Sequence, residues 1–305
     1  MIPDDMRVYI EGRDVTENLD IRACTYTDEG ADKTDHAELN VGNKADMLRW
    51  KVRAGEHLRI TAGGVDSGEL LIYGAYPMSD NFIIASRAAP DAAYTQRYTA
   101  YEDATVGDIA RTLAREMGLK ARLFGVTAGQ RLKYVQRSGD SAPAFLARVL
   151  TPQAGVVKFA SGAICGISLD WALKQPVCAS IDIQDPDEQI GTAMIDMTAP
   201  AAICRVTSPY GGAEVATGAS GIELIETDAP VYSASQALSW ASGALRRYNA
   251  VRGLFEVETE FDARIYALGR VKCSYPSERI YLAGAVQHDF CEGVTHVIMM
   301  AGGGA

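Results

Sequence analysis

The sequence has no cluster of basic residues and few aromatic ones. Its formal net charge is −10, with 39 acidic and 29 basic residues, and no run of Lys and Arg is longer than the pair Arg246-Arg247. Because such a surface repels a phosphate backbone, this balance argues against specific nucleic-acid binding. Only 8% of the residues are aromatic and no loop concentrates them, which argues against an aromatic-rich receptor- or glycan-binding loop.

Long apolar runs and paired cysteine motifs are also missing. No apolar run approaches the roughly 18–20 residues that a membrane helix needs, so we expect no membrane insertion. The six cysteines have irregular spacing and no C-x-x-C pair, and Cys165 and Cys204 lie in apolar surroundings. We therefore expect buried thiols in a reducing compartment, with a disulfide framework as the alternative.

Three residues near the C-terminus are of the types that ligate zinc: His288, Cys291 and His296. However, Glu292-Gly293 is typical of a two-residue hairpin turn, which would pair His288 with Val297. Since side chains alternate along a strand, the two histidines would then point to opposite faces of the hairpin. A single metal ion could not reach both, so we interpret them as ordinary strand histidines.

Acidic residues gather in two places without the spacing of a known site. The first group, within residues 182–188, lacks the calcium-loop pattern and is interrupted by Pro186. The second group, Glu256, Glu258 and Glu260, has the two-residue period of a strand face exposed to water. Paired carboxylates of a glycosidase can lie far apart in sequence, so that alternative stays open. The first group consists of Asp182, Asp185, Asp187 and Glu188.

Local catalytic motifs are missing as well. The sequence has no G-x-S-x-G elbow, and its glycine pairs at Gly211-Gly212 and Gly218–Gly221 lack the Lys-Ser/Thr of a phosphate loop. We therefore predict that the protein is not an enzyme. We also predict that it has no catalytic, cofactor-binding or metal-binding residues and uses no cofactor.

The sequence does carry clear signals for strands and helices. A chain of 305 residues is long enough for two or three cores. Short apolar runs bounded by Gly, Pro, Asn and Asp predict strands within residues 7–90. Capping residues and helical spacing of apolar residues predict three helices, at 105–117, 141–150 and 234–249. Further strands are predicted at 255–262, 265–274, 280–288 and 294–300. Together these elements predict an α+β, β-dominated protein.

Several segments follow one another in the order of a known family. They are Val8–Thr16, Gly30–Asp32 with Asp35–Leu39, Trp50, Gly55 and Leu58–Ile60, then Thr105–Ala110 with Gly118-Leu119, Tyr134–Asp140 with Ala144–Arg148, Gly269–Val271 and Tyr281–His288. This ordered set resembles the late-control-gene-D-type phage tail proteins, and it is similar to the N-terminal half of type VI secretion spike proteins. Two departures stand out: Ser138-Gly139 replaces a more acidic run, and residues 165–230 find no counterpart.

The resemblance implies two related β-barrel domains with a small helical α/β insert between them. Residues 1–90 would form the first tube-type barrel, completed by a return segment at about 166–202. Residues 91–165 would form the insert with two helices. Residues 203–305 would form the second barrel, with one long helix near 234–249.

The resemblance also implies a structural role as the baseplate hub of a contractile phage or phage-like tail. Three copies would form a ring that adapts the six-fold tail tube to the three-fold central spike. Expected partners are two further copies, the spike, the tail tube, the tape-measure protein and other baseplate proteins such as wedge proteins. The expected location is the tail baseplate of a particle assembled in the bacterial cytoplasm. The alternatives are a tail-associated peptidoglycan hydrolase and a receptor- or glycan-binding tail-tip module.

Overall fold

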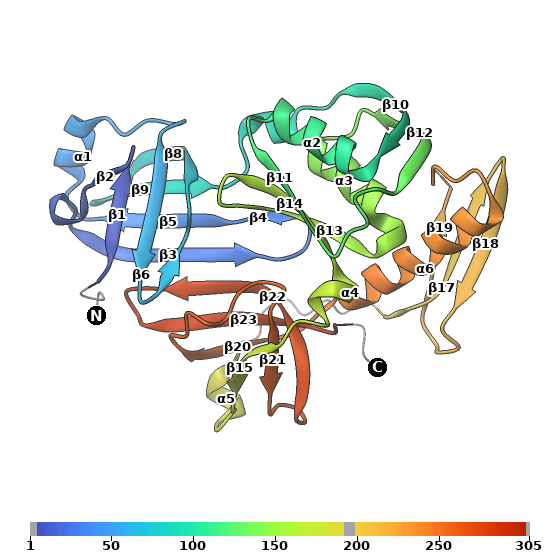
Figure 1. The fold of residues 1–305 in the computed structure, drawn as a ribbon. Coiled ribbons are helices and arrows are strands. Elements are labelled where there is room, and N and C mark those ends of the chain that lie inside the picture. Colours follow the sequence, from blue (N-terminus) through green and yellow to red (C-terminus); the bar gives the residue numbers. More distant parts are fainter. Residues whose placement is uncertain (1–4, 192–198, 228, 303–305) are drawn as a thin grey trace.

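The structure is a computed structural model that describes residues 5–191, 199–227 and 229–302. Its largest feature is a 14-stranded sheet that runs through both ends of the chain (Figure 1). The strands are β1 (Arg7–Ile10), β2 (Arg13–Asp14), β3 (Ile21–Glu29), β5 (His36–Val41), β6 (His57–Ala62), β7 (Val65–Asp66), β8 (Leu70–Met78), β9 (Asn81–Arg87), β15 (Val177–Ile181), β16 (Ile190–Gly191), β20 (Gly253–Glu260), β21 (Arg270–Cys273), β22 (Arg279–Asp289) and β23 (Val294–Met300).

The N-terminal part of this sheet follows the order β3-β5-β9-β8-β6-β1-β2, with antiparallel neighbours. In Figure 1 the strands β1, β6 and β8 cross in front of β3 and β5, so the sheet folds over itself. Alternate residues of these strands, such as Val8, Leu39, Ile60 and Ile84, are buried together in the space between. A short helix, α1 (Lys44–Trp50), lies at the end of this part.

The C-terminal part of the sheet combines β20–β23 with two strands from the middle of the chain. β15 runs parallel to β21, and β16 pairs with β20. The sequence prediction placed residues 166–202 with the first barrel. This detail is wrong, because the two strands that lie wholly within this segment, β15 and β16, pair with C-terminal strands. Residues 192–198 of that segment lie outside the described residues. No local pattern indicates which distant strand completes a sheet, so the sequence could not reveal this pairing.

The two parts of the sheet are joined edge to edge by β3 and β22. These strands pair antiparallel from Ala285 opposite Glu29 to Asp289 opposite Thr25. The backbones come so close beyond this ladder that a Cβ on Gly30 would lie 2.1 Å from the carbonyl oxygen of Gly284. Segments more than 250 residues apart in sequence therefore form one continuous sheet.

The insert contains the first two predicted helices, and both are confirmed as α2 (Val106–Glu116) and α3 (Ala142–Leu150). Thr105 and Asp108 form the expected capping box, and Gly118 adopts the left-handed conformation after the helix, with φ of +72°. The helices pack against a four-stranded sheet of order β11-β14-β13-β4, and β10 pairs with β12 beside them. These strands are β4 (Lys33–Thr34), β10 (Tyr98–Thr105), β11 (Lys120–Phe124), β12 (Arg131–Ser138), β13 (Gly155–Ala160) and β14 (Ala163–Ser168).

A separate small sheet begins at residue 201. It consists of β17 (Ala201–Ser208), β18 (Gly211–Ala216) and β19 (Ile222–Glu226), and the third predicted helix, α6 (Ala234–Ala250), covers one face of it. These elements bury a core of their own. Residues 203–305 therefore do not form a single unit, contrary to the sequence prediction. The short elements η1 (Thr16–Asn18), η2 (Asp91–Tyr94), η3 (Thr151–Gln153), α4 (Leu169–Ala172) and α5 (Pro186–Gln189) complete the described chain.

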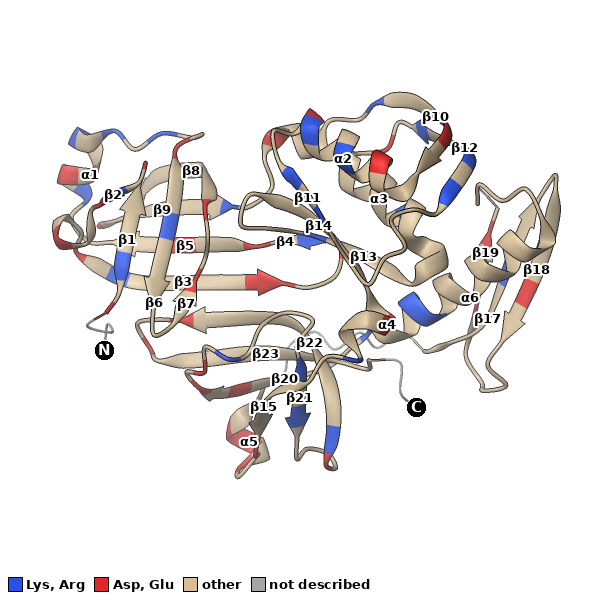
Figure 2. Ribbon diagram, in the orientation of Figure 1, with Lys and Arg blue, Asp and Glu red and all other residues tan. Residues whose placement is uncertain are grey.

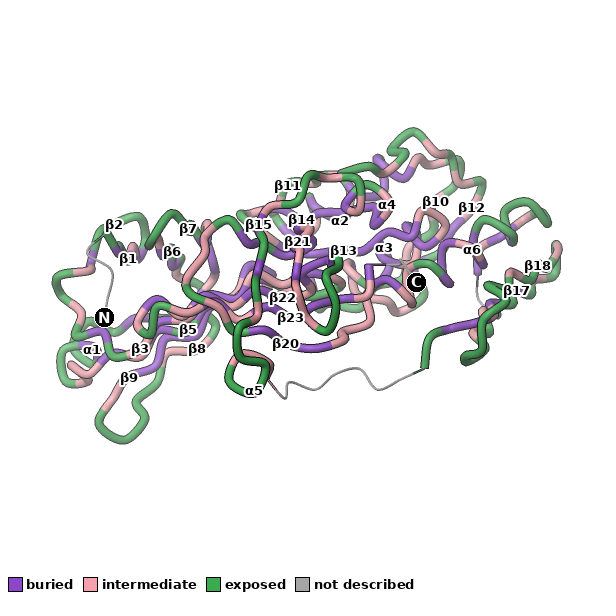
Figure 3. Tube along the Cα trace, turned by 90° about the horizontal axis from the view of Figure 1, so that it is seen from below, coloured by how far each residue is buried: buried purple, intermediate pink, exposed green. Residues whose placement is uncertain are grey.

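The predicted α+β, β-dominated class is confirmed. Figure 3 shows buried segments running through the stacked strands and the insert, while the β8–β9 turn, α5 and the turns of the small sheet lie exposed. The predicted alternation along β20 is also confirmed, with Phe255 and Val257 buried and Glu258 and Glu260 exposed. The strand predicted at 265–274 is shorter than expected, because only Arg270–Cys273 is extended and paired.

Candidate functional site

A buried ion cluster lies where the two parts of the large sheet meet the insert. Lys158 of β13 is only 7% exposed, and its ammonium contacts carboxylates from two other elements. One is Asp28 of β3, and the other is Asp35, which lies between β4 and β5 with its Oδ1 3.2 Å from Lys158 Nζ. The side chain of Lys158 thus ties the insert to the N-terminal strands.

The two carboxylates extend this cluster to the rest of the junction. Asp35 accepts hydrogen bonds from the backbone N–H of Glu29 at 3.0 Å and from the hydroxyl of Tyr26 at 3.2 Å. Asp28 accepts a hydrogen bond from the backbone N–H of Ala267 at 2.8 Å. Ala267 belongs to the loop before β21, so the cluster links the N-terminal part, the insert and the C-terminal part of the molecule.

Burial and the two carboxyl groups shift the pKa values of the residues in this cluster. Burial, and then the nearby charge of Asp28, raise the pKa of Asp35 to about 7. Burial alone would lower the pKa of Lys158, but the two carboxylates outweigh it and the pKa is raised. One ammonium therefore faces two carboxyl groups, and Asp35 is the one that takes up a proton as the pH falls to neutrality.

A second set of contacts ties α6 to the insert. Arg247 of α6 forms an ion pair with Asp32, whose Oδ1 also accepts a hydrogen bond from the backbone N–H of Val157 at 3.1 Å. A Cβ on Gly243 would lie 1.9 Å from the carbonyl oxygen of Thr151, so only glycine allows the helix to approach the insert this closely. The small sheet and its helix are thus anchored to the insert.

The structure places His288 and His296 on opposite faces of the hairpin, as predicted, although the predicted register is wrong. His288 pairs with Thr295 rather than Val297, because the β22–β23 turn contains four residues instead of two. His288 is buried, with its Nδ1 3.1 Å from Thr295 Oγ1, and burial lowers its pKa. His296 lies 3.7 Å from Glu256 and 3.8 Å from Glu258. Within the described ranges, no group of three or more potential ligands could hold a metal ion.

The two acidic groups of the sequence lie near each other. The first includes α5, where Asp185 caps the helix by accepting a hydrogen bond from the N–H of Asp187 at 3.0 Å. This short helix packs beside β20, which carries the second group, and Figure 2 shows the acidic residues of both elements on the same edge of the molecule. The result is an acidic edge near the end of the large sheet, where β20 pairs with the short outer strand β16.

All six cysteines are free, and Cys24, Cys165, Cys204 and Cys273 are buried. Burial raises the pKa of the Cys204 thiol to about 11, so at neutral pH it remains protonated and unreactive. None of the helices in the described part of the chain is both long and apolar enough to cross a membrane.

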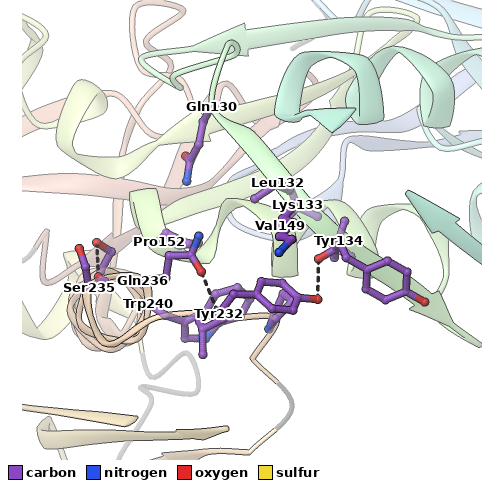
Figure 4. Close-up of a pocket in the computed structure, with 14 residues that line it drawn as sticks. Gln130, Leu132, Lys133, Tyr134, Val149, Pro152, Tyr232, Ser235, Gln236 and Trp240 are labelled. Carbon is purple, nitrogen blue, oxygen red and sulfur yellow. Dashed lines mark hydrogen bonds between the residues drawn. The ribbon is translucent and has the colours of Figure 1, made fainter. Parts of the chain in front are cut away.

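Sequence reasoning missed a hollow between the insert and α6. A cavity of about 90 Å³ is lined by residues of β12, α3 and α6 and of the loop before α6 (Figure 4). An adjoining hollow of about 450 Å³ shares Lys133, Tyr134 and Tyr232 with it and adds Tyr210 from the β17–β18 turn. Figure 4 shows the Tyr232 hydroxyl bonded to the carbonyl oxygen of Tyr134, at 3.1 Å. These aromatic residues are far apart in sequence, so no local pattern could have revealed the site.

Comparisons with known proteins rest on structure alone. No protein-family description and no curated protein matches the sequence. Among solved structures, the 43 kDa tail protein of prophage MuSo2 from Shewanella oneidensis is 12% identical, with a TM-score of 0.69 and 98% of each chain covered. A tail protein from Neisseria meningitidis is 11% identical, with a TM-score of 0.71, and the match covers 97% of this chain and 96% of that one.

The chain has the fold of phage tail proteins. A third similar structure is a component of the Escherichia coli type VI secretion system that itself exhibits structural similarity to the T4 tail proteins gp27 and gp5. It is 10% identical, with a TM-score of 0.59, and the match covers 96% of this chain and 76% of that one. The resemblance of the sequence to phage tail proteins is therefore confirmed at the level of the fold.

Proposed function

We propose that this chain is a structural tail protein and serves as the central hub of a phage-type baseplate. The observation that carries the proposal is the shared fold with the Shewanella tail protein, which extends over 98% of both chains. A likeness over the full length argues for a shared overall architecture rather than for one common domain. In this proposal the folded N-terminal and C-terminal parts of the large sheet act as paired barrels, and three copies form a ring.

The junction fits this role. A hub that transmits force between a tube and a spike must keep its two strand surfaces in fixed relative positions. The β3–β22 ladder makes the two parts continuous, and the cluster of Lys158, Asp28 and Asp35 ties the insert to both. Ring closure would also cover strand edges that would otherwise invite aggregation.

The acidic edge suggests how the ring is oriented. If Glu256, Glu258 and Glu260 line the central channel, passing DNA or tape-measure protein would be repelled rather than bound. Variants in which these three residues are replaced by Lys should then assemble normally but eject poorly. Normal ejection by such particles would exclude this orientation.

The proposed partners are two further copies of the chain, the central spike, the tail tube, the tape-measure protein and neighbouring wedge proteins. The proposed location is the tail baseplate of a particle assembled in the host cytoplasm. The role is non-enzymatic. A peptidoglycan hydrolase remains the enzymatic alternative, and the purified chain should therefore leave the turbidity of a cell-wall suspension unchanged.

Deletion of the gene tests the proposal directly. Induced lysates of the deletion strain should contain no complete tails by electron microscopy, and a plasmid copy of the gene should restore them. A point variant at a half-exposed site outside the buried ion cluster, such as Lys272→Met, should restore them equally well. Complete, infective tails in the deletion strain would contradict a hub function.

A further inference from the structure

The hollow between the insert and α6 has the lining of a ligand-binding site, whatever the chain does in tail assembly. Four aromatic side chains line its two adjoining chambers: Tyr134, Tyr210, Tyr232 and Trp240. The ring centroids of Tyr210 and Tyr232 lie 5.2 Å apart with an angle of 41° between the ring planes, and Tyr210 is 65% exposed. Together these two rings form an accessible aromatic platform at the mouth of the site.

Charged side chains of both signs surround this platform. Glu102, Asp103 and Lys133 line the outer chamber, and none of them has an ion-pair partner among the residues that the structure describes. Glu102 lies directly opposite Tyr134 in the β10–β12 ladder. A ligand in this chamber would therefore meet two carboxylates that can only accept hydrogen bonds and one ammonium that can only donate them.

The inner chamber adds a polar group that lacks a partner. Trp240 lines this chamber and is only 4% exposed, and its indole N–H has no hydrogen-bond partner among the described residues. Leaving a buried donor unpaired costs about 1–3 kcal/mol, so such groups in folded proteins call for an acceptor. Gln130, Ser235, Gln236 and Ser239 give the same chamber further amide and hydroxyl groups.

We propose that this hollow binds a neutral oligosaccharide. A pyranose ring has an apolar C–H face that stacks on aromatic rings and a rim of hydroxyls that both donate and accept hydrogen bonds. The hydroxyls can therefore form hydrogen bonds with Glu102, Asp103 and Lys133 together. The indole nitrogen of Trp240 is itself buried, so in this proposal the indole rotates on binding and donates its hydrogen bond to a sugar oxygen. Sites of this kind commonly lie between two structural units, as this one does.

A proline-rich peptide would also fit an aromatic groove, but it matches the polar groups less well. Its backbone offers carbonyl acceptors and few N–H donors, because proline has none. Such a peptide would therefore offer few donors to the carboxylates of Glu102 and Asp103. The observed mixture of charges favours the sugar.

The test measures binding of chitotetraose, cellotetraose and maltotetraose to the full chain by isothermal titration calorimetry. We expect saturable binding of at least one of them, with a Kd of about 1 mM or tighter. Tyr210→Ala should weaken binding about tenfold, because a stacking platform is removed from an exposed position without disturbing the core. Tyr98→Ala is the matched control, since Tyr98 is 79% exposed and lies outside the hollow.

A second variant separates the ring of Trp240 from its N–H. Trp240→Phe keeps an aromatic ring and removes the donor, so it should also weaken the bound sugar, about fivefold. Three results would overturn the proposal: no saturable binding of any of the three sugars, equal binding by Tyr210→Ala and Tyr98→Ala, or binding of a proline-rich peptide such as decaproline in their place. Each of these results would leave the proposed tail function untouched.

Discussion

Replacing Lys158 by methionine should destabilise the protein more than any surface charge change. The substitution removes the ammonium that faces Asp28 and Asp35 and leaves two buried carboxylates behind. Removing one partner of a buried ion pair typically costs about 3–5 kcal/mol, because the remaining charge loses its compensation. Lys272→Met is the matched control, since Lys272 is half-exposed and its partner Glu278 is largely exposed. Breaking that pair should cost less than about 1 kcal/mol.

The loss of stability in Lys158→Met should depend on pH, in a direction that follows from the pKa of Asp35. The pKa of Asp35 is raised from its ordinary 3.8 to about 7 in the folded protein. Between these values the folded state binds a proton that the unfolded state does not bind, so the contribution of Asp35 to the unfolding free energy increases as the pH falls from about 7 towards 4. In Lys158→Met the carboxyl groups can relieve their repulsion by protonation, and the defect should therefore be smaller at pH 5 than at pH 8.

Urea unfolding followed by circular dichroism at both pH values measures these effects. At pH 8 the midpoint of Lys158→Met should fall well below that of Lys272→Met, and Lys158→Met combined with Asp35→Asn should recover part of the loss. Equal midpoints for the two single variants at pH 8 would refute the idea that the cluster holds the junction. A defect that grows towards pH 5 would refute the assigned direction of the pKa of Asp35.

Three further predictions concern helices and close contacts. Thr105→Ala removes the cap of α2 and should lower the unfolding free energy by about 1 kcal/mol in thermal melts. Arg137→Met removes a 1% exposed guanidinium that bonds three partners, and should cost about 3 kcal/mol, whereas the exposed Arg111→Met should cost less than about 0.5. Gly243→Ala forces α6 away from the insert and should speed proteolysis there, while Gly129→Ala, with open space around it, should not.

Elements with strong local signals could be predicted from the sequence. The capping box at Thr105, the proline in the first turn of α3 and the alternation along β20 each depend on a few neighbouring residues, and all three were correct. Helical spacing alone does not determine which face of α6 is buried. Leu238 is 53% exposed, although it lies three residues from the buried Ala241.

Features that depend on distant residues could not be predicted. The pairing of β15 and β16 with C-terminal strands joins residues 65–93 positions apart in the sequence. The cluster of Asp28, Asp35 and Lys158 and the aromatic hollow are likewise assembled from separate elements. The ordered resemblance to tail proteins indicated the overall fold, but neither these strand pairings nor the sites.

The proposed function is a hub ring between tube and spike. Cryo-electron microscopy of intact tail particles from the strain that carries the gene tests it most directly. We expect three copies of the chain in one ring at the junction of tube and spike, with the acidic edge of β20 facing the channel. Density for the chain elsewhere on the particle, or a tail that lacks the chain altogether, would contradict the proposed hub function.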